Sequence, residues 1–393
     1  MTKLKKQIRS ALAFIILMGF VSLFSDIVYE GARSIAGQFL GLLGASAAAV
    51  ALVAGLGEFI GYSFRLVSGY LADRTKKYWL FTLIGYGMNL FAIPMLALVG
   101  NWQLAFVLLI AERFGKALRK PARDTMMSYA AKQVGSGFGF GLEEALDQIG
   151  AVAGPVFLSL VLALKSGEEI SKYRFGFAIL FVPAAVSVAL LIIARILFPA
   201  PSQFEKDSQD VEAKGKFSRK FIWYLIAICL IAAGFADFPF IAFHVSQEKV
   251  FAASLIPILY ALAMGVDAAA ALVFGKLYDK FGVTILMVSS GLTAMFAPLV
   301  FLTKNPWVIA VGISLWGIGM GAQESILKAV VADIVPKERR GTAYGIFNTL
   351  FGLAWFLGSF TMGILYGISI VAMVVFSIMM EVFAIVALTR LKK

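Results

Sequence analysis

The sequence contains few of the side chains that hold metals or form disulfides. Its 393 residues include one cysteine and one histidine. The cysteine, Cys229, lies inside an apolar stretch, so an internal disulfide and a cysteine-based metal site are both excluded. The sequence also has no HExxH motif and no phosphate-binding loop. We therefore expect no metal, no cofactor and no enzymatic activity.

Charged residues are also scarce, whereas apolar residues are abundant. Charged side chains make up 15% of the chain and hydrophobic ones 60%, with a mean hydropathy of +0.87. Soluble domains have about 25% charged and about 45–50% apolar residues. Most of the chain is therefore expected in lipid, where every backbone N–H and C=O must be paired within a helix or a closed barrel. The apolar runs are roughly 20 residues or longer, about twice the length of barrel strands, so we predict helices.

Twelve apolar runs can be distinguished. The first six cover residues 11–40, 46–71, 78–99, 102–120, 137–164 and 174–198. The second six cover residues 221–246, 252–277, 283–303, 306–330, 341–366 and 368–389. The polar stretch between the two sets cannot enter hydrocarbon. We predict an all-α polytopic membrane protein, with an N-terminal six-helix bundle at 1–198, a cytoplasmic linker at 199–220 and a C-terminal six-helix bundle at 221–393.

Lysine and arginine are unevenly distributed between the loops, and the formal net charge is +12. Most basic residues fall on one side of the predicted membrane, among them Arg9, Arg74, Lys116, Arg119, Lys120, Arg123, Lys220, Lys276, Lys328, Arg340 and Arg390. The other side has only Lys165, Lys172, Arg174, Lys249 and Lys304. This asymmetry predicts that both termini and the linker are cytoplasmic, in an inner cell membrane. Basic loops contact anionic lipid, and without a soluble basic domain we expect no nucleic-acid partner.

Two short motifs occur at matching places in both halves of the chain. Gly69-Tyr-Leu-Ala-Asp73-Arg74 follows the second run, and Gly275-Lys-Leu-Tyr-Asp279-Lys280 follows the eighth. Gly137-Phe-Gly-Phe-Gly141 opens the fifth run, and Gly341-Thr-Ala-Tyr-Gly345 opens the eleventh. These matches indicate a duplicated six-helix unit, which generally has its substrate site between the halves near the midplane of the bilayer.

The first of these motifs is similar to a motif of a known family. The segment from Gly69 to Lys77 resembles G-x-L-(a)-D-(r/k)-x-(g)-(r/k)-(r/k), found between helices two and three of the major facilitator superfamily, and 275–280 resembles its weaker echo. With twelve runs and a central linker, the resemblance extends over essentially the whole chain. It implies the twelve-helix major facilitator fold in two pseudo-symmetric halves. It also implies that the conformational machinery includes Gly69, Asp73, Arg74, Gly275 and Asp279.

A second motif concerns the direction of transport. Gly141, Gly150, Gly154 and Pro155 have the spacing of the fifth-helix antiporter motif of that superfamily, G-x8-G-x3-G-P-x2-G-G, although the final glycine pair is absent. The resemblance implies the drug/proton antiporter branch. In the alternative interpretation, small residues four apart only let helices pack closely and the proline only kinks the helix.

Acidic and basic residues inside the first and fourth runs are candidates for coupling or substrate binding. Asp26, Glu30 and Arg33 have the spacing i, i+4, i+7, which puts them on one helix face. A charge near the bilayer centre is costly and by default marks function. A proton-coupled carrier needs a carboxyl that gains and loses a proton, and Arg33 or Arg113 could tune it. Alternatively, Glu30 and Arg33 form an internal salt bridge.

Other candidates lie in the fifth and seventh runs. Glu143 and Asp147 share a face and either contribute to substrate binding or form a charge network with the basic end of the fourth run. Asp237 occupies a place in the seventh run similar to that of Asp26 in the first. His244 shares its face and is either a proton relay or a hydrogen-bonded structural group.

These features favour a secondary active transporter that works by alternating access as a monomer in the lipid bilayer. We expect proton-coupled efflux of a small organic solute by antiport. The alternative is an uptake symporter or uniporter for a small organic anion or metal chelate. A different class, a non-transporting receptor or lipid scramblase, could use the same scaffold, because fold does not fix function.

Overall fold

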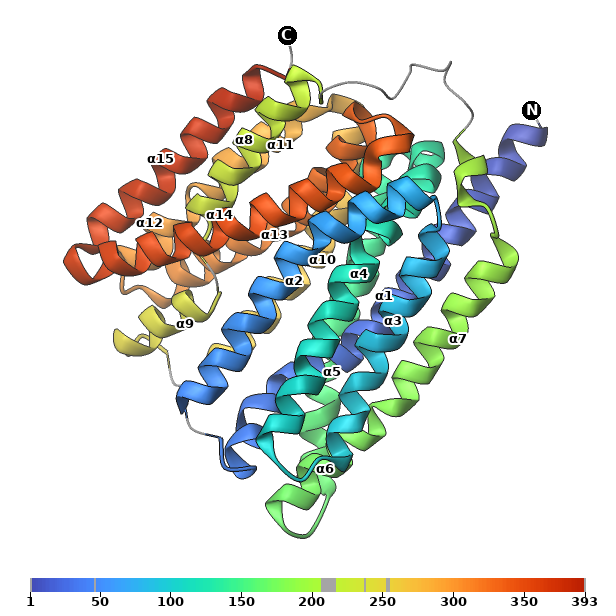
Figure 1. Ribbon diagram of the computed structural model, residues 1–393. Helices are drawn as coiled ribbons and strands as arrows, with labels where there is room; N and C mark the ends of the chain where they lie inside the picture. The colour runs from blue at the N-terminus through green and yellow to red at the C-terminus, as the bar shows by residue number, and fades with distance from the viewer. Residues whose placement is uncertain (1, 46, 206–216, 237, 252–254, 392–393) are drawn as a thin grey trace. The chain divides into compact units, whose positions relative to one another are not determined.

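The computed structural model describes residues 2–45, 47–205, 217–236, 238–251 and 255–391, in which every regular element is a helix. Figure 1 labels most of them in chain order. The N-terminal half contains α1 (Thr2–Leu42), α2 (Ala47–Thr75), α3 (Tyr78–Met95), η1 (Leu96–Leu98), α4 (Trp102–Val134), α5 (Ser136–Leu164), α6 (Glu169–Ile179), α7 (Phe181–Leu197) and η2 (Pro201–Phe204). The C-terminal half contains α8 (Arg219–Gly234), α9 (Phe238–Gln247), α10 (Ile256–Phe281), α11 (Val283–Thr293), α12 (Phe296–Phe301), α13 (Pro306–Ile334), η4 (Lys337–Arg339), α14 (Arg340–Ile368) and α15 (Ile370–Thr389).

The helices follow the twelve predicted runs. In the described residues, nine helical segments are long and apolar enough to cross a membrane. The other runs are filled by α2, by α4 with its several charges, and by α8 with α9. The sixth run is divided into α6 and α7, and the ninth into α11 and α12. The predicted all-α, twelve-span fold is therefore confirmed.

Several helices begin where a polar side chain can accept a hydrogen bond from an otherwise unpaired backbone N–H. Ser218 accepts from Phe221 before α8, at 3.1 Å. Asn305 accepts from Trp307 at 3.0 Å, with a proline at the first position of α13. Ser369 performs the same role before α15, at 3.3 Å. These caps explain why the spans start sharply after short loops.

The fourth helix is longer than predicted. The run was expected to end at residue 120, but α4 continues to Val134 and includes Pro121. The residues after 120 are mostly buried, including Arg123 and Asp124. The charged sequence was interpreted as a loop because isolated charges are costly in lipid. Here the charges have partners inside the protein, so the helix continues.

By packing, the chain forms two compact units, which we describe separately. Unit 1 comprises Met1–Val134, Leu146–Lys206 and Lys337–Ile346. Unit 2 comprises Gly135–Ala145, Asp207–Pro336 and Phe347–Lys393. Each unit therefore combines most of one half with about two turns of a helix whose remainder lies in the other unit. These helices are α5 and α14.

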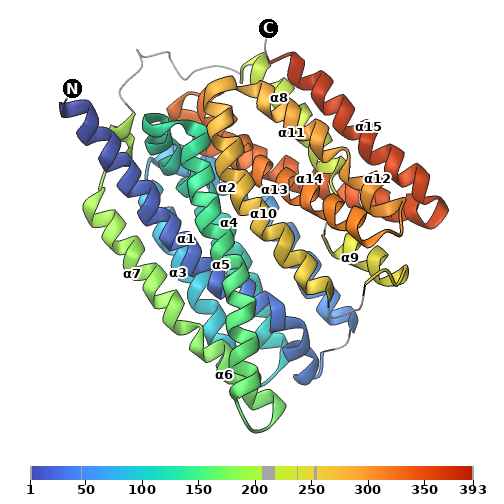
Figure 2. The ribbon, with the colours of Figure 1, turned by 180° about the vertical axis from the view of Figure 1, so that it is seen from behind.

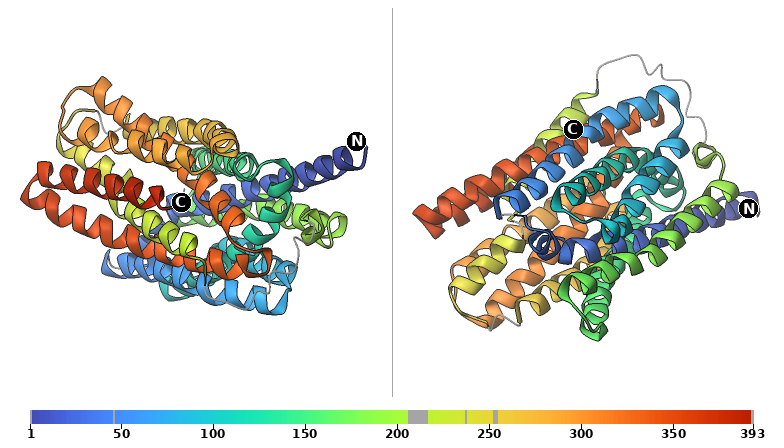
Figure 3. Two further views of the ribbon diagram at one scale, coloured as in Figure 1. Left: turned by 90° about the horizontal axis from the view of Figure 1, so that it is seen from above. Right: turned by 60° about the horizontal axis from the view of Figure 1, so that its bottom comes forward.

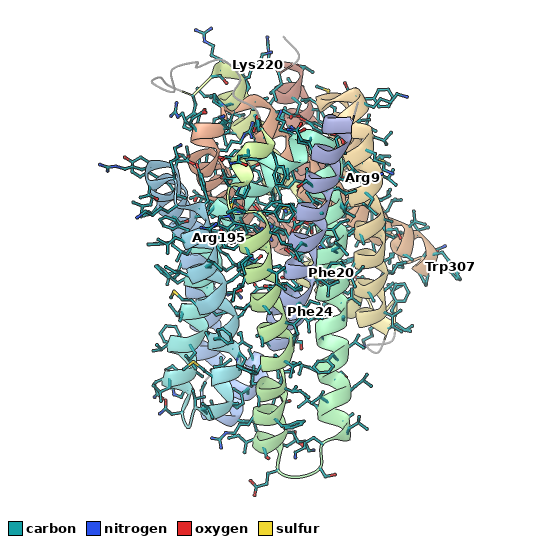
Figure 4. The ribbon with its side chains drawn as sticks, turned by 90° about the vertical axis from the view of Figure 1, so that its right-hand side faces the viewer. Arg9, Phe20, Phe24, Arg195, Lys220 and Trp307 are labelled. Atoms are coloured by element: carbon teal, nitrogen blue, oxygen red, sulfur yellow. The ribbon has the colours of Figure 1, made fainter. Side chains whose placement is uncertain are left out.

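Within unit 1, α3 packs against α4 and α7, and α1 packs against α4 and α7 (Figure 3). Within unit 2, α10 packs against α13, and α15 packs against α8 and α11 (Figure 2). Large apolar side chains cover the outer surfaces of both units. Phe20 lies on α1, one turn before Phe24, and is 41% exposed; Trp307 at the start of α13 is 83% exposed (Figure 4). Such surfaces suit contact with lipid, and aromatic residues at helix ends suit the membrane interface.

Candidate functional site

A column of cations on α4 faces a polar stripe on α1, within unit 1. Arg113, Lys116, Arg119 and Arg123 are three or four residues apart, so they share one side of α4. Their partners on α1 are Tyr29, Ser25 and Ser22. We call these seven residues, together with Asp26 and Glu30, the α1–α4 seam.

The partners follow each other along the two helices. The Arg123 guanidinium donates to the Ser22 hydroxyl at 2.8 Å. The Arg119 guanidinium donates to the Ser25 hydroxyl at 3.3 Å and lies over the Tyr86 ring, 3.9 Å from its centre. Both arginines are nearly inaccessible, at 4% and 5% exposed. Hydrogen bonds and aromatic faces thus compensate part of the cost of burying these two cations.

Tyr29 is the point where two cations meet on α1. The Lys116 ammonium lies 3.3 Å from the centre of its ring, and the Arg113 guanidinium lies 5.0 Å away. Arg113 also donates to the Tyr29 hydroxyl. Because the face of an aromatic ring attracts cations, one tyrosine positions both side chains.

Carboxyl groups lie on both helices of the seam. Asp26 and Glu30 are half-buried, and both act electrostatically on Lys116. Glu30 also lies 3.7 Å from Arg33, whose side chain is 54% exposed. This is the internal pair that the sequence offered as an alternative, and its exposure makes it weak.

On α4, a second carboxyl supports Arg113. Glu112 lies 3.3 Å from the Arg113 guanidinium and accepts a 2.6 Å hydrogen bond from Asn89 of α3. Arg113 is therefore fixed between an acid on its own helix and a tyrosine on α1. The structure thus brings together four of the predicted site residues, Asp26, Glu30, Arg33 and Arg113.

Sequence reasoning did not select Lys116, Arg119 and Arg123 as site residues and counted them among the basic residues of the cytoplasmic side. The structure places all three inside α4, which continues beyond the predicted end at residue 120 and so includes Arg123. Their spacing from Arg113 continues one helix face, and this was the signal that could have identified them.

The glycines of the fifth-helix motif bring α5 against the helix that bears Asp26. A methyl group at Gly150 would overlap the backbone carbonyl of Leu23, and one at Gly154 would lie 2.6 Å from the carbonyl oxygen of Ile27. A methyl group at Gly31 on α1 would lie 3.3 Å from the carbonyl oxygen of Gly154. Pro155 follows inside α5. Figure 2 shows α5 beside α1, and the contact lies next to Asp26 and Glu30 in the sequence of α1.

The first loop motif forms a latch at the start of α14, within unit 1. Asp73 accepts hydrogen bonds from the backbone N–H groups of Gly341 (3.0 Å) and Thr342 (2.6 Å), and from the Thr342 hydroxyl (2.8 Å). Tyr78 donates a fourth, at 2.9 Å. A carboxylate at a helix N-terminus satisfies unpaired N–H groups and the helix dipole together. Gly69 lies against the Gly341 backbone, where a methyl group would overlap its carbonyl.

The echo of this motif forms a second latch at the start of α5, within unit 2. Asp279 accepts from the backbone N–H groups of Gly137 (2.7 Å) and Phe138 (2.8 Å). Gly275 lies against Gly137, and Gly141 lies against the Ala271 carbonyl. The two repeated motifs of the sequence are thus the two sides of each latch. Arg74, which was grouped with these residues, is exposed.

The remaining predicted residues lie elsewhere. Glu143, together with Glu144, faces the ammonium group of Lys328 on α13, at 3.9 and 3.1 Å, within unit 2. Asp147 is half-buried and belongs to unit 1. The Nδ1 atom of His244 lies 2.9 Å from the Tyr366 hydroxyl, beside the Phe301 ring. Asp237 lies outside the described residues. Lys328, which was also counted among the basic residues of the cytoplasmic side, lies inside α13 and is 6% exposed.

The sequence matches the family model of the Major Facilitator Superfamily over residues 10–359 and again over 239–391. The chain belongs to this superfamily. It is 37% identical over 388 residues to an uncharacterized protein of Mycobacterium tuberculosis, covering 98% of this chain and 94% of that protein. It is 29% identical over 368 residues to an uncharacterized MFS-type transporter of Methanocaldococcus jannaschii, covering 90% and 88%. The fold is similar to that of a fucose:proton symporter of E. coli, with a TM-score of 0.74 at 15% identity over 98% of this chain and 100% of that one. As a member of the Major Facilitator Superfamily, the protein is a multi-pass membrane transporter and not an enzyme.

Proposed function

We propose that this transporter exports a small organic solute in exchange for protons, by alternating access. The observation that supports this proposal is the α1–α4 seam, where Asp26 and Glu30 lie within electrostatic range of Lys116. A carboxyl close to a cation can release its proton when the cation approaches and bind it again when the cation leaves. Arg113 and Lys116 are held by one tyrosine, so a movement of α1 against α4 changes both distances together.

The antiport direction is supported by the motif on α5. Its glycines at 150 and 154 pack on α1 near Asp26, so the motif and the proposed coupling carboxyl share one helix contact. We further propose that the protein lies in the inner membrane with both termini in the cytoplasm, on the basis of the lysine and arginine asymmetry. Lys116, Arg119, Arg123 and Lys328 lie inside α4 and α13 and do not count toward that asymmetry.

The proposal is tested with the purified full chain in proteoliposomes. Solutes are first screened by thermal stabilisation, since binding to the native state raises apparent stability. Each stabilising solute is then added to vesicles that contain the pH dye pyranine, with and without an imposed pH gradient. We expect solute movement to be accompanied by opposite proton movement. Solute movement that never changes internal pH would contradict proton coupling.

A matched pair of variants localises the coupling. Asp26→Asn should abolish gradient-driven movement while leaving exchange of solute at equal pH. Glu169→Gln is the control, because Glu169 is a 63% exposed carboxyl of the same unit, paired with Lys172 on the surface. If Asp26→Asn accumulates solute as the wild type does, Asp26 has no part in coupling.

A second candidate function is uptake of a small organic anion. It is favoured by the four cations of the seam, Arg113, Lys116, Arg119 and Arg123, since planar guanidinium groups bind carboxylates and phosphates well. The same vesicles distinguish the two. An anion that enters together with protons, rather than against them, would support symport in place of export.

A further inference from the structure

A second charged cluster lies in unit 2, on three helices. Asp267 of α10 faces Glu324 and Lys328 of α13 and Glu144 at the start of α5, and these three act on it electrostatically. Glu143 joins the cluster through Lys328, at 3.9 Å. We call these five residues the unit 2 acid cluster. With every carboxyl ionised, four negative charges would surround one ammonium group inside spanning helices.

Asp267 differs from the other members. It is 0% exposed, and neither carboxylate oxygen has a hydrogen-bond partner in the described part of the chain. Its Oδ1 atom lies against the bare backbone of Gly321, where a methyl group would be 2.9 Å away. Gly321, Glu324 and Lys328 share one face of α13. The carboxyl of Asp267 is therefore directed at the face of α13 that bears Glu324 and Lys328.

An ionised carboxylate without a partner is among the most costly groups to bury, because it loses its hydration and gains nothing in return. Lys328 cannot neutralise the whole cluster, since its ammonium already lies 3.1 Å from Glu144. A proton on Asp267 removes the cost. A metal ion fits less well, because it would require several ligands and would be repelled by Lys328, whereas a proton needs only one oxygen.

We propose that Asp267, with Glu324 and Lys328, forms a proton-binding site of this transporter, separate from the α1–α4 seam. The proton is bound when Lys328 pairs with Glu144 and released when Lys328 moves toward Asp267. The claim that this site couples protons to transport rests on the proposed function. The claim that the site binds a proton does not.

The titratable groups that face Asp267 come from two other helices. From α13 they are Glu324 and Lys328, and from the start of α5 they are Glu144 and, through Lys328, Glu143. The sequence of α11 has no titratable residue, and the histidine of α9, His244, is engaged with Tyr366. Glu381 on α15 is also 0% exposed, but Ser290 of α11 lies beside its carboxyl, and among the described residues no cation or second acid accompanies it. It provides a matched control.

The test measures the proton itself, by infrared spectroscopy of the full chain in lipid nanodiscs. The C=O stretch of protonated carboxyl groups is recorded across a pH titration, in water and in D₂O. We expect one titrating component of this band in the wild type to be lost in Asp267→Asn and to return in Asp267→Glu. Glu381→Gln should leave this component in place. A titration of Asp267→Asn that superimposes on the wild type would overturn the proposal.

Two further measurements separate the possible failures. Lys328→Met should retain the band to higher pH, since removing a positive charge favours the protonated carboxyl. Sodium chloride added at constant pH should not change the band. If the band were lost on adding sodium, the site would bind a metal ion and not only a proton. In the pyranine vesicles, a wild type without proton movement refutes the proposed function alone. Coupled transport that persists in Asp267→Asn refutes the coupling role of this site alone.

Discussion

The two latches use the same motif but differ in burial and in the number of hydrogen bonds. Asp73 is 7% exposed and accepts four, whereas Asp279 is exposed and accepts the two backbone bonds that are described for it. The tyrosines beside the two aspartates differ as well. Tyr78, five residues after Asp73, donates to it, whereas Tyr278, directly before Asp279, donates to Asp333, at 2.8 Å. Duplication has kept the glycine contact and the helix cap in both units, while the side-chain partners have diverged.

The comparison suggests that close helix contact, and not the hydrogen bonds, is the shared requirement. Gly69 and Gly275 both face a glycine of the helix that their aspartate caps. Each helix therefore approaches its neighbour at backbone distance, which places the carboxylate within reach of the N-terminal N–H groups. If this is correct, loss of the glycine contact should destabilise the protein more than loss of the hydrogen bonds.

The largest effect is expected from a methyl group at the contact. Gly69→Ala should lower the free energy of unfolding by roughly 2–3 kcal/mol, because the methyl group meets a backbone carbonyl that has no rotamer to change. Gly275→Ala should cost about as much. Gly61→Ala, on the same helix α2 with nothing within 4 Å, is the control and should stabilise the protein slightly, because alanine favours a helix more than glycine does. Thermal unfolding in one detergent measures all three, and a harmless Gly69→Ala would refute the ranking.

The next effect separates the two aspartates. Asp73→Ala should destabilise the protein by about 2 kcal/mol, because a cap is lost and buried donors are left unpaired. Asp279→Ala should cost about 1 kcal/mol, since water can reach the freed N–H groups. Equal losses in the same unfolding assay would show that burial does not distinguish the latches.

The tyrosines should show a smaller effect with a clear pattern. Tyr78→Phe is expected to cost about 1 kcal/mol, the contribution of one hydrogen bond. In a double-mutant cycle, Tyr78→Phe and Asp73→Ala should not be additive, because they remove the same bond. Tyr278→Phe and Asp279→Ala should be close to additive. Non-additivity of that second pair would mean that Tyr278 interacts with Asp279 as Tyr78 does with Asp73.

The smallest effect concerns an exposed pair, which contrasts with the buried latches. Lys304 lies 2.7 Å from Glu248 in the loops of unit 2 and holds the pKa of that carboxyl below its ordinary value. Glu248 in turn raises the pKa of Lys304. A lowered acid pKa stabilises the fold above about pH 4.3 and a raised lysine pKa stabilises it below about pH 10.4.

Glu248→Gln should therefore lower the melting temperature slightly at neutral pH. The difference from the wild type should vanish as the pH falls through the lowered pKa of Glu248, and it should shrink in high salt, because exposed pairs are screened. Melting curves at neutral and acidic pH, each at low and high salt, measure it. A difference in melting temperature that grows as the pH falls would contradict a stabilising ion pair between Lys304 and Glu248.

Much of the fold could be predicted from the sequence, because a lipid environment leaves few options for apolar runs of this length. The loop motifs were also identified, but not what they bind. A pattern of Gly69 and Asp73 does not indicate that its partners are Gly341 and Thr342, which lie far along the chain. The matching glycines of Gly341-Thr-Ala-Tyr-Gly345 were visible only as a repeat.

The errors in the candidate site have one physical cause. Lys116, Arg119, Arg123 and Lys328 were counted among the basic residues of the cytoplasmic side and not as site residues, because an isolated cation does not belong in hydrocarbon. In the folded chain they are paired with serines, aromatic rings and carboxylates that come from other helices. The hydropathy of one run does not show that side chains of another run offset the cost of burying its charges. The length of α4 and the extent of the α1–α4 seam could therefore not be predicted.

The latches have a further consequence for how the molecule could be divided. The first takes its aspartate from the N-terminal half of the sequence and its capped helix from the C-terminal half, and the second has the reverse arrangement. If the gene were split at the central linker, each fragment would contain the aspartate of one latch and the capped helix of the other. Neither fragment could form a complete latch by itself, so only production of the two fragments together should restore a protease-resistant protein.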